Sequence, residues 1–442
     1  MNSSHSFVDS YIAHRLLLHS PRDTSCVPAS KLPQGTGHTK PSNMGLPTSM
    51  RALVLDAINK TAAVQRIPLP RPGRDEVLVK VHSIALNPVD ALYVSNPLGQ
   101  SGRTIGSDFS GTVVSVPTTS TLHSGDRVAG FLQGACSVND RPGAFTEYLI
   151  CPADLLWLVP ASMTFEQAAT VSLCALTAAQ AIFYRMGLLQ PFAWCSSTSS
   201  RPTSPTPMPT PMESRNPRYF FIYGASTSVG LYAAQLVRSI PTFATDGRPI
   251  VLIGAASKAR FKALSAAPYN YDHLVDYREA EWPTQILDIT GGNGVDFAYD
   301  CISEGSTVGQ TASVLNSKGK LAIVRSREGG AWTSDDLRGG IEPSYGAVWE
   351  GLGEAVQYQG MSLLASKEAR GFAVAFYEWL SSGKARVMTT PVRLMPGGLE
   401  KVVEDGLTLL GPGSMDDRGK GRNEEWMKPV SVEKLVYHVS AA

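Results

Sequence analysis

The feature that most restricts the fold of this chain is a regular alternation of short apolar segments with helix-forming segments between residues 219 and 324. Strands that are joined by helices run parallel in one sheet, and the helices cover both of its faces. The sequence therefore predicts an α/β doubly wound parallel sheet. Its strands are expected at residues 219–223, 250–253, 274–276, 295–300 and 320–324, and its helices at residues 228–239, 258–266 and 305–315.

The first of these strands continues into the loop Gly224-Ala-Ser-Thr-Ser-Val-Gly230 and then into a helix. Backbone N–H groups and the helix dipole at such a turn attract a pyrophosphate, which predicts a Rossmann dinucleotide-binding domain. Compared with the G-x-G-x-x-G pattern, Ala225 and Thr227 replace the first two glycines, and Gly230 remains where the helix packs on the strand. The βα turn of an unrelated doubly wound domain is the alternative interpretation.

The second strand of the sheet bears on the choice of cofactor. An NAD site uses an acid near the end of this strand for the ribose 2′-hydroxyl, whereas an NADP site uses cations for the 2′-phosphate. Residues 250–256 contain no acid, and Ser257, Lys258, Ala259 and Arg260 follow. The sequence therefore favours NADPH, although Lys258 and Arg260 could instead lie on the solvated face of the next helix.

The segments on either side of this domain predict a second, β-rich unit. Residues 50–150 alternate between short strands and turns, and Thr164 with Gln167 forms a capping box before a helix expected at residues 168–186. Two further helices are expected at residues 367–381 and 399–409, and a strand at residues 433–439 that rejoins the β-rich unit. Residues 190–217 hold seven prolines and are expected to form a loop.

Composition excludes several classes of function. The 39 basic and 38 acidic side chains give a net charge of +1, which disfavours binding to nucleic acid. There is no apolar run long enough to span a bilayer, so we expect no membrane association. The six cysteines are scattered, which favours reduced thiols and a cytoplasmic location. The first 49 residues are rich in Ser, Thr and Pro and are expected to be disordered.

This order of segments resembles the medium-chain dehydrogenase/reductase superfamily. The resemblance covers residues 50–439 and rests on five stretches: Ala85-Leu-Asn-Pro-Val-Asp90, Ile105-Gly-Ser-Asp-Phe-Ser-Gly111, Gly125-Asp-Arg-Val128, Gly143-Ala-Phe-Thr-Glu-Tyr148 and Cys174-Ala-Leu-Thr-Ala178. It implies a GroES-like β-rich catalytic domain beside the Rossmann domain. We expect an N-terminal extension at 1–49, the catalytic domain at 50–186, a Pro/Ser-rich loop at 190–217, the nucleotide-binding domain at 218–344 and a return to the catalytic domain at 345–442.

The same resemblance bears on metal binding. In zinc-dependent members, the position of Asn87 is a cysteine, and Gly-His-Glu stands where this chain has Gly106-Ser107-Asp108. Cys174 matches the third ligand position, but a single thiolate does not hold Zn²⁺, which needs three or four converging donors. We therefore expect no metal and a buried, structural Cys174. Without a Lewis acid, hydride addition to a conjugated alkene suits the chain better than alcohol oxidation does.

Within the superfamily, the chain resembles the zinc-free, trans-acting enoyl reductases that work with fungal polyketide synthases. The features that carry this resemblance are the Pro/Ser-rich insertion, the Tyr-Gly-Ala-Ser-Thr loop, Val275-Asp-Tyr-Arg278, Asp300-Cys-Ile-Ser303 and Lys434-Leu-Val-Tyr437. The resemblance implies NADPH contacts from Asn87, Pro88, Val89, Asp90, Ser226, Thr227, Ser228, Val229, Ser257, Lys258, Ala259, Arg260, Tyr277, Val324, Arg325, Ser431 and Val432. It implies a substrate wall from Cys174, Ala175, Leu176, Thr177, Ala178, Ala179, Gln180, Ala181, Tyr345, Gly346, Ala347, Val348 and Trp349.

Two residues are candidates for a catalytic role. Related sequences often have a lysine where this chain has Leu92, so the group that protonates the substrate α-carbon is unassigned. Tyr93 is a candidate, but a tyrosine in a half-buried loop more often packs with its hydroxyl satisfied, and solvent can protonate an enolate. Thr177 can orient the nicotinamide amide or the substrate carbonyl, unless its hydroxyl bonds to its own helix.

The function expected from the sequence is reduction by NADPH of an enoyl thioester on the carrier domain of a polyketide synthase, or of a hybrid of synthase and peptide synthetase. Two alternatives remain at this point. One is a free-standing, zinc-independent quinone oxidoreductase of the same fold. The other is a non-catalytic NADPH-binding partner of the synthase. The identity of the polyketide, the stereochemistry and the oligomeric state are open.

Overall fold

The computed structural model describes residues 45–118, 120–136, 141–194, 216–241, 247–335, 337, 340–358, 360–418 and 422–439. Residues from Pro47 onward form one compact unit. The expected disorder of residues 1–49 and the expected loop at residues 190–217 fall largely outside the described residues. Among the described residues, no helix has the length and apolar character required to cross a membrane.

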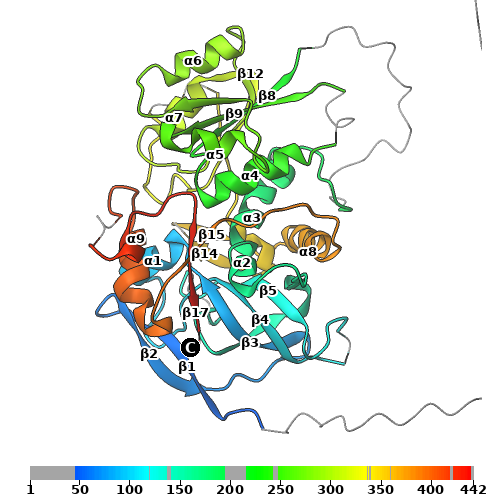
Figure 1. The fold of residues 1–442 in the computed structure, drawn as a ribbon, viewed down its shortest axis with the longest axis vertical. Coiled ribbons are helices and arrows are strands. Elements are labelled where there is room, and N and C mark those ends of the chain that lie inside the picture. Colours follow the sequence, from blue (N-terminus) through cyan, green and yellow to red (C-terminus); the bar gives the residue numbers. More distant parts are fainter. Residues whose placement is uncertain are drawn as a thin grey trace, which may run out of the picture. The chain divides into compact units, whose positions relative to one another are not determined.

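The predicted doubly wound sheet is confirmed (Figure 1). Six strands pair in the order β10-β9-β8-β11-β12-β13, and all the pairings are parallel. The strands are β8 (Arg218–Tyr223), β9 (Ile250–Ala256), β10 (His273–Asp276), β11 (Val295–Asp300), β12 (Leu315–Ile323) and β13 (Ser344–Tyr345). The helices are α4 (Ser228–Arg238), α5 (Phe261–Ser265), α6 (Trp282–Ile289) and α7 (Thr307–Ser313), with a 3₁₀ turn at Lys258–Arg260.

Alternation along β8 explains why helices cover both faces of this sheet. Phe220 is buried in the same core as Leu231 of α4. Phe221 points to the opposite face, where it stacks on Trp282 of α6 at 5.5 Å between ring centroids and shares a core with Val308 of α7. Successive side chains of a strand point to opposite faces, so an apolar strand with no polar side requires cover on both.

The β-rich part contains a seven-stranded sheet in the order β16-β17-β3-β4-β5-β7, with β6 on β3. As predicted, the last strand of the chain returns to it and pairs antiparallel with β3 (Figure 1). The strands are β3 (Glu76–Ala85), β4 (Asp108–Ser115), β5 (Arg127–Phe131), β6 (Tyr148–Pro152), β7 (Trp157–Leu158), β16 (Val392–Leu394) and β17 (Lys434–His438). Two further pairs are β1 (Ser49–Asp56) with β2 (Thr61–Pro68), and β14 (Val356–Tyr358) with β15 (Met361–Leu363).

The prediction of one helix at residues 168–186 is wrong, although its capping box is present. The segment forms α2 (Phe165–Ala169), α3 (Ser172–Ala179) and a π-helix (Gln180–Arg185). The break has a cause far away in the sequence. Asp108 Oδ1 of β4 accepts the backbone N–H of Leu173 at 2.9 Å, and Ser172 Oγ accepts the indole N–H of Trp157 at 2.9 Å. Both contacts hold the first turn of a new helix.

Helices elsewhere agree less evenly with the predictions. Helix α8 (Lys367–Ser381) has the predicted bounds. The helix predicted at residues 399–409 is instead a 3₁₀ turn (Gly398–Lys401), a π-helix (Val402–Leu407) and α9 (Thr408–Leu410). The prediction of a half-buried loop around Tyr93 is wrong, because Tyr93 is buried in α1 (Pro88–Ser95). A 3₁₀ turn at Val348–Leu352 follows β13.

Candidate active site

The loop after β8 has the geometry of an anion-binding turn. Gly224 has a φ of +74°, a conformation that favours glycine, and Thr227 is the N-cap of α4. Thr227 Oγ1 accepts the N–H of Gly230 at 3.0 Å and donates to the carbonyl of Gly224 at 2.8 Å. Thr227 stands at the position of the second glycine in G-x-G-x-x-G, and its hydroxyl stabilises the turn through these two hydrogen bonds. Ser226, Ser228 and Val229 are half-buried at the start of the helix.

A side chain at position 230 has no room, which accounts for the glycine that remains in this loop. A Cβ there would lie 2.4 Å from the carbonyl oxygen of Gly224 and 3.0 Å from the carbonyl carbon of Ala225. Both atoms belong to the backbone, so no side-chain rotation relieves the contact. Helix α4 therefore packs closely against the end of β8 at its N-terminus, where backbone N–H groups of a helix favour an anion.

The cations expected at the ribose end face acids that sequence reasoning missed. Lys258 Nζ lies 2.8 Å from Glu279 Oε1, and this hydrogen bond raises the pKa of Lys258. The backbone N–H of Lys258 donates to Asp276 Oδ2 at 3.1 Å. Arg260 is half-buried, and its Nε has no hydrogen-bond partner among the described residues. Of these two cations, Arg260 has unused donor capacity, whereas Lys258 is partly neutralised.

The remaining expected residues of this end follow β9 and β10. Ser257 is half-buried ahead of the 3₁₀ turn and Ala259 is exposed. Tyr277, which follows β10, is 41% exposed, and the guanidinium of Arg278 lies over its ring at 5.4 Å from the centroid. An exposed ring of this kind offers a flat face to an adenine base.

The ends of β11 and β12 meet at Ser303. Its Oγ accepts the N–H of Val324 at 3.0 Å, and Arg325 is ion-paired with Glu304 at 2.6 Å. Burial raises the pKa of nearby Asp300 to about 6, although hydrogen bonds from Thr307, Ser303 and Ile302 favour the carboxylate. Expected contact residues from the tail include Ser431, which is half-buried, and Val432, whose φ of +60° is a strained conformation for a β-branched residue.

A buried polar network stands at the start of α1. Asn87 Nδ2 donates to Ser107 Oγ at 3.0 Å and to Asp108 Oδ2 at 2.9 Å, and Cys174 Sγ lies 3.4 Å from Asn87 Oδ1. Asp90 accepts the N–H of Asn87 at 2.8 Å and the hydroxyl of Ser107 at 2.9 Å. The side chains of Asn87 and Asp90 are therefore used within the protein.

Two consequences follow for this end of the expected cofactor site. Pro88 of the expected set is exposed, whereas Val89 is half-buried and packs against the hydrophobic core. Burial raises the pKa of Asp90 to about 7, and its hydrogen bonds with Asn87 and Ser107 limit the rise.

Lys434 of β17 belongs to the same network, and sequence reasoning missed it. Its Nζ lies 2.5 Å from Asp108 Oδ2, and the exposures of the two side chains are 3% and 0%. A lysine at an inward position of a strand is the signal that could have identified it, because lysine is almost never fully buried without a partner.

Most side chains of the expected substrate wall are buried. In α3 and the following π-helix, Cys174, Ala175, Leu176, Ala178, Ala179, Gln180 and Ala181 are buried, and Thr177 is half-buried. Thr177 Oγ1 donates to the carbonyl of Leu173 at 2.8 Å. Its hydroxyl hydrogen is thus used, and its lone pairs remain as acceptors. Burial is the main reason that the pKa of the Cys174 thiol is raised.

The second part of that wall joins an aromatic cluster. Ala347, Val348 and Trp349 are buried, and Tyr345 and Gly346 are half-buried. The rings of Tyr93 and Tyr358 lie 5.7 Å apart between centroids, and Trp349 lies 5.8 Å from Tyr358. Burial raises the pKa of Tyr345 and of Tyr358, and the neighbouring tyrosines add to it. The structure therefore places Tyr93 beside the expected substrate wall.

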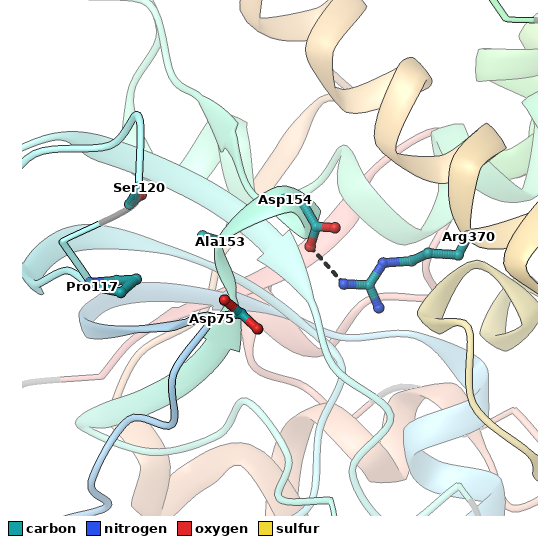
Figure 2. A pocket seen from close by; sticks show the side chains of 6 residues that line it. All are labelled: Asp75, Pro117, Ser120, Ala153, Asp154 and Arg370. Carbon is teal, nitrogen blue, oxygen red and sulfur yellow. Dashed lines mark hydrogen bonds and ion pairs between the residues drawn. The ribbon is translucent and has the colours of Figure 1, made fainter.

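A pocket of about 360 Å³ lies elsewhere on the β-rich part (Figure 2). Arg370 of α8 points toward Asp154, and its Nη2 lies 2.5 Å from Asp154 Oδ1. None of its lining residues is an expected cofactor or substrate residue, so we assign it no role. The lining residues are Asp75, Pro117, Ser120, Ala153, Asp154 and Arg370.

Two segments of this chain match known protein families. Residues 73–161 match the alcohol dehydrogenase GroES-like domain, and residues 229–331 match the zinc-binding dehydrogenase family. The trans-enoyl reductase traG of Penicillium crustosum is 30% identical over 377 residues, which cover 81% of this chain and 93% of that protein. The chain belongs to the trans-enoyl reductases. The expected membership of the medium-chain dehydrogenase/reductase superfamily is thereby confirmed.

Solved structures share the fold of this trans-enoyl reductase. The CurK enoyl reductase has a TM-score of 0.60 at 17% identity, with 88% of this chain and 98% of that chain covered. A mycobacterial protein complexed with NADPH has a TM-score of 0.57 at 20% identity, with 88% and 100% covered. Both support a GroES-like domain joined to a nucleotide-binding domain.

The residues present do not fit the zinc ion that one family description implies. Among the described residues there is no group of three or more His, Cys, Asp or Glu side chains that could hold a metal. An amide, Asn87, and a hydroxyl, Ser107, stand at two of the ligand positions of the zinc-dependent relatives, and the ammonium of Lys434 lies between Asp108 and Cys174. A zinc site needs converging N, S or carboxylate donors and no cation among them.

Proposed function

We propose that this trans-enoyl reductase transfers hydride from NADPH to the β-carbon of an enoyl thioester held on a polyketide synthase carrier domain, in the cytoplasm. The observation that carries the proposal is the hydrogen-bonded network of Asn87, Asp108 and Lys434, which stands where metal ligands would stand. Such a site has no Lewis acid for an alkoxide, whereas a conjugated thioester already delocalises the charge that arrives with the hydride.

The reaction consumes one NADPH and one proton and releases NADP⁺. When bound, NADPH supplies two electrons and one hydrogen as hydride. The new C–H bond forms at the β-carbon, the alkene π electrons move into the thioester carbonyl, and the α-carbon then takes a proton. We propose Tyr93 for this proton, because it lies beside Tyr358 and the expected substrate wall. Proton transfer from solvent is the competing route.

Purified protein, NADPH and a crotonyl thioester on an isolated synthase carrier domain test the reaction. We expect loss of NADPH absorbance at a rate that exceeds the rate with soluble quinones. If the protein binds NADPH but fails to oxidise it with every enoyl thioester tested, the proposal is overturned. Rapid oxidation with quinones alone would identify a quinone oxidoreductase, and binding without any oxidation would identify a non-catalytic partner of the synthase.

The preference for NADPH is expected to depend on Arg260 more than on Lys258. Arg260→Ala should lower the ratio of kcat/KM for NADPH to that for NADH by at least about tenfold, since hydrogen bonds to a charged group contribute about 1.5–3 kcal/mol. Lys258→Ala should lower it by about threefold, because Glu279 already engages that ammonium. Exposed Lys262 of α5 supplies the control, Lys262→Ala. Equal ratios in all variants would refute this ribose site.

Thr177 is expected to accept a hydrogen bond from the nicotinamide amide. Because its own hydrogen is donated to Leu173, Thr177 cannot at the same time donate to a substrate carbonyl. Thr177→Val keeps the shape but removes the acceptor, so the KM for NADPH should rise about fivefold, as for one lost hydrogen bond. Thr177→Ser should retain the wild-type KM. An unchanged KM in the valine variant would leave Thr177 with a structural role only.

A further inference from the structure

Four residues from three segments that are far apart in the sequence meet in one buried network. Asn87, Ser107, Asp108 and Cys174 correspond to the metal-ligand segments of zinc-dependent relatives, and in this chain hydrogen bonds connect them directly. The exposed fractions of Asn87, Ser107 and Asp108 are 2%, 0% and 0%, and that of Cys174 is 4%. The network is therefore a group of polar side chains that is buried away from solvent.

Strand β17 contributes one ammonium group to this network, that of Lys434. Lys434 Nζ lies 2.5 Å from Asp108 Oδ2, 3.4 Å from the carbonyl oxygen of Thr170 and 3.5 Å from Cys174 Sγ. An ammonium has three N–H donors and no acceptor, and these three neighbours can each accept one. The contacts of Lys434 are thus those of a cation surrounded by a carboxylate, a carbonyl and a sulfur.

The residues around this ammonium begin two helices. Asp108 holds the N–H of Leu173 in the first turn of α3 with one carboxylate oxygen and shares the other between Lys434 and Asn87. Asn87 is in turn the N-cap of α1. The Thr170 carbonyl also accepts the hydroxyl of Tyr232 at 3.3 Å, and Tyr232 belongs to α4 of the nucleotide-binding part. One side chain therefore connects β17 with α1, α3 and α4.

The ammonium stays charged in this setting. Burial opposes its charge, but the Asp108 carboxylate and the Cys174 sulfur outweigh burial and raise the pKa of Lys434. A charge that is buried with its partner is destabilising to separate, because removal of one member leaves the other without compensation. The pair is thus a fixed feature of the folded protein.

We propose that the Lys434 ammonium is a built-in cation at the place of the absent metal, and that it positions α1 and α3 for hydride transfer. This inference rests on the proposed function, which places the proton donor Tyr93 on α1 and the nicotinamide contact Thr177 on α3. Lys434 acts through Asp108 and Asn87 and is a positioning residue.

Variants of Lys434 separate positioning from binding. Lys434→Met keeps the length of the side chain and removes the charge, and Lys434→Arg keeps the charge. With NADPH and the N-acetylcysteamine thioester of crotonic acid, we expect kcat to fall at least about tenfold in Lys434→Met and to stay within about threefold of wild type in Lys434→Arg. The dissociation constant of NADPH should change less than about threefold in both, because the phosphates bind at the other sheet. Lys320→Met, a lysine that donates to the Met186 carbonyl outside this network, is the matched control.

A second readout does not depend on turnover. The fluorescence of the bound nicotinamide should match wild type in the arginine and Lys320→Met variants and should change in Lys434→Met at full NADPH saturation. An inactive wild-type protein would overturn the proposed function, and the fluorescence comparison would still test Lys434. The double variant Lys434→Met/Asp108→Asn removes both charges of the pair. It replaces Lys434→Met in the test if that single variant fails to fold. Wild-type kcat and fluorescence in either methionine variant would overturn the inference.

Discussion

The Gly230→Ala substitution is expected to lower the free energy of unfolding by about 3 kcal/mol and to raise the KM for NADPH at least about tenfold. The added Cβ would lie 2.4 Å from the Gly224 carbonyl oxygen and 3.0 Å from backbone carbon atoms of Ala225. Since only backbone surrounds it, α4 must move away from β8, and the N–H groups of the loop move with it. Urea denaturation and NADPH titration measure the two effects.

Gly371 supplies the matched control for this prediction. It lies within α8, and the nearest atom to a Cβ built there is Trp194 Nε1, at 3.9 Å. Gly371→Ala is expected to raise the free energy of unfolding by about 0.5–1 kcal/mol, because alanine favours the helix and no neighbour must move. The same substitution in two helices thus has opposite expected signs. Equal destabilisation of both variants would contradict the close approach of α4 to β8.

Local periodicity explains which parts of the fold could be predicted. The strand at 295–300 and the helix at 367–381 have the predicted bounds, because alternation or helical spacing of apolar residues is contained within each segment. The break between α2 and α3 depends on Asp108, a residue 65 positions away from Leu173. No window of sequence around the helix contains that information.

The same reason limits what could be predicted of the site. The absence of an acid on β9 was visible in the sequence, but the acid that pairs with Lys258 is Glu279, which lies beyond the next strand. Lys434 stands 326 positions from Asp108, and its role follows from the return of β17 to the sheet of β3 and β4. Motif spacing identifies residues near a turn, whereas a buried charge pair is defined by the tertiary fold.

Asp90 is expected to make the stability of this enzyme depend on pH between about 4 and 7. Burial raises its pKa in the folded protein to about 7, whereas the unfolded chain has an ordinary value of about 3.9. The folded state therefore holds more protons than the unfolded state in this range, so stability is largest at low pH and falls as the pH rises through 7. Three pKa units correspond to about 4 kcal/mol at most.

The Asp90→Asn variant isolates this effect. Its amide can accept the N–H of Asn87 and donate to Ser107, so the network is kept while the proton is no longer exchanged. Between about pH 5.5 and about pH 8.5, the wild type should lose about 2 kcal/mol of unfolding free energy relative to the variant, as measured by urea denaturation. Asp56→Asn is the control, because hydrogen bonds with Asn59 lower the pKa of this carboxyl at the end of β1, so that it is ionised in both states throughout that range. A constant difference between wild type and Asp90→Asn would show that Asp90 is ionised in the folded protein, and hence that the network carries one more negative charge than Lys434 balances.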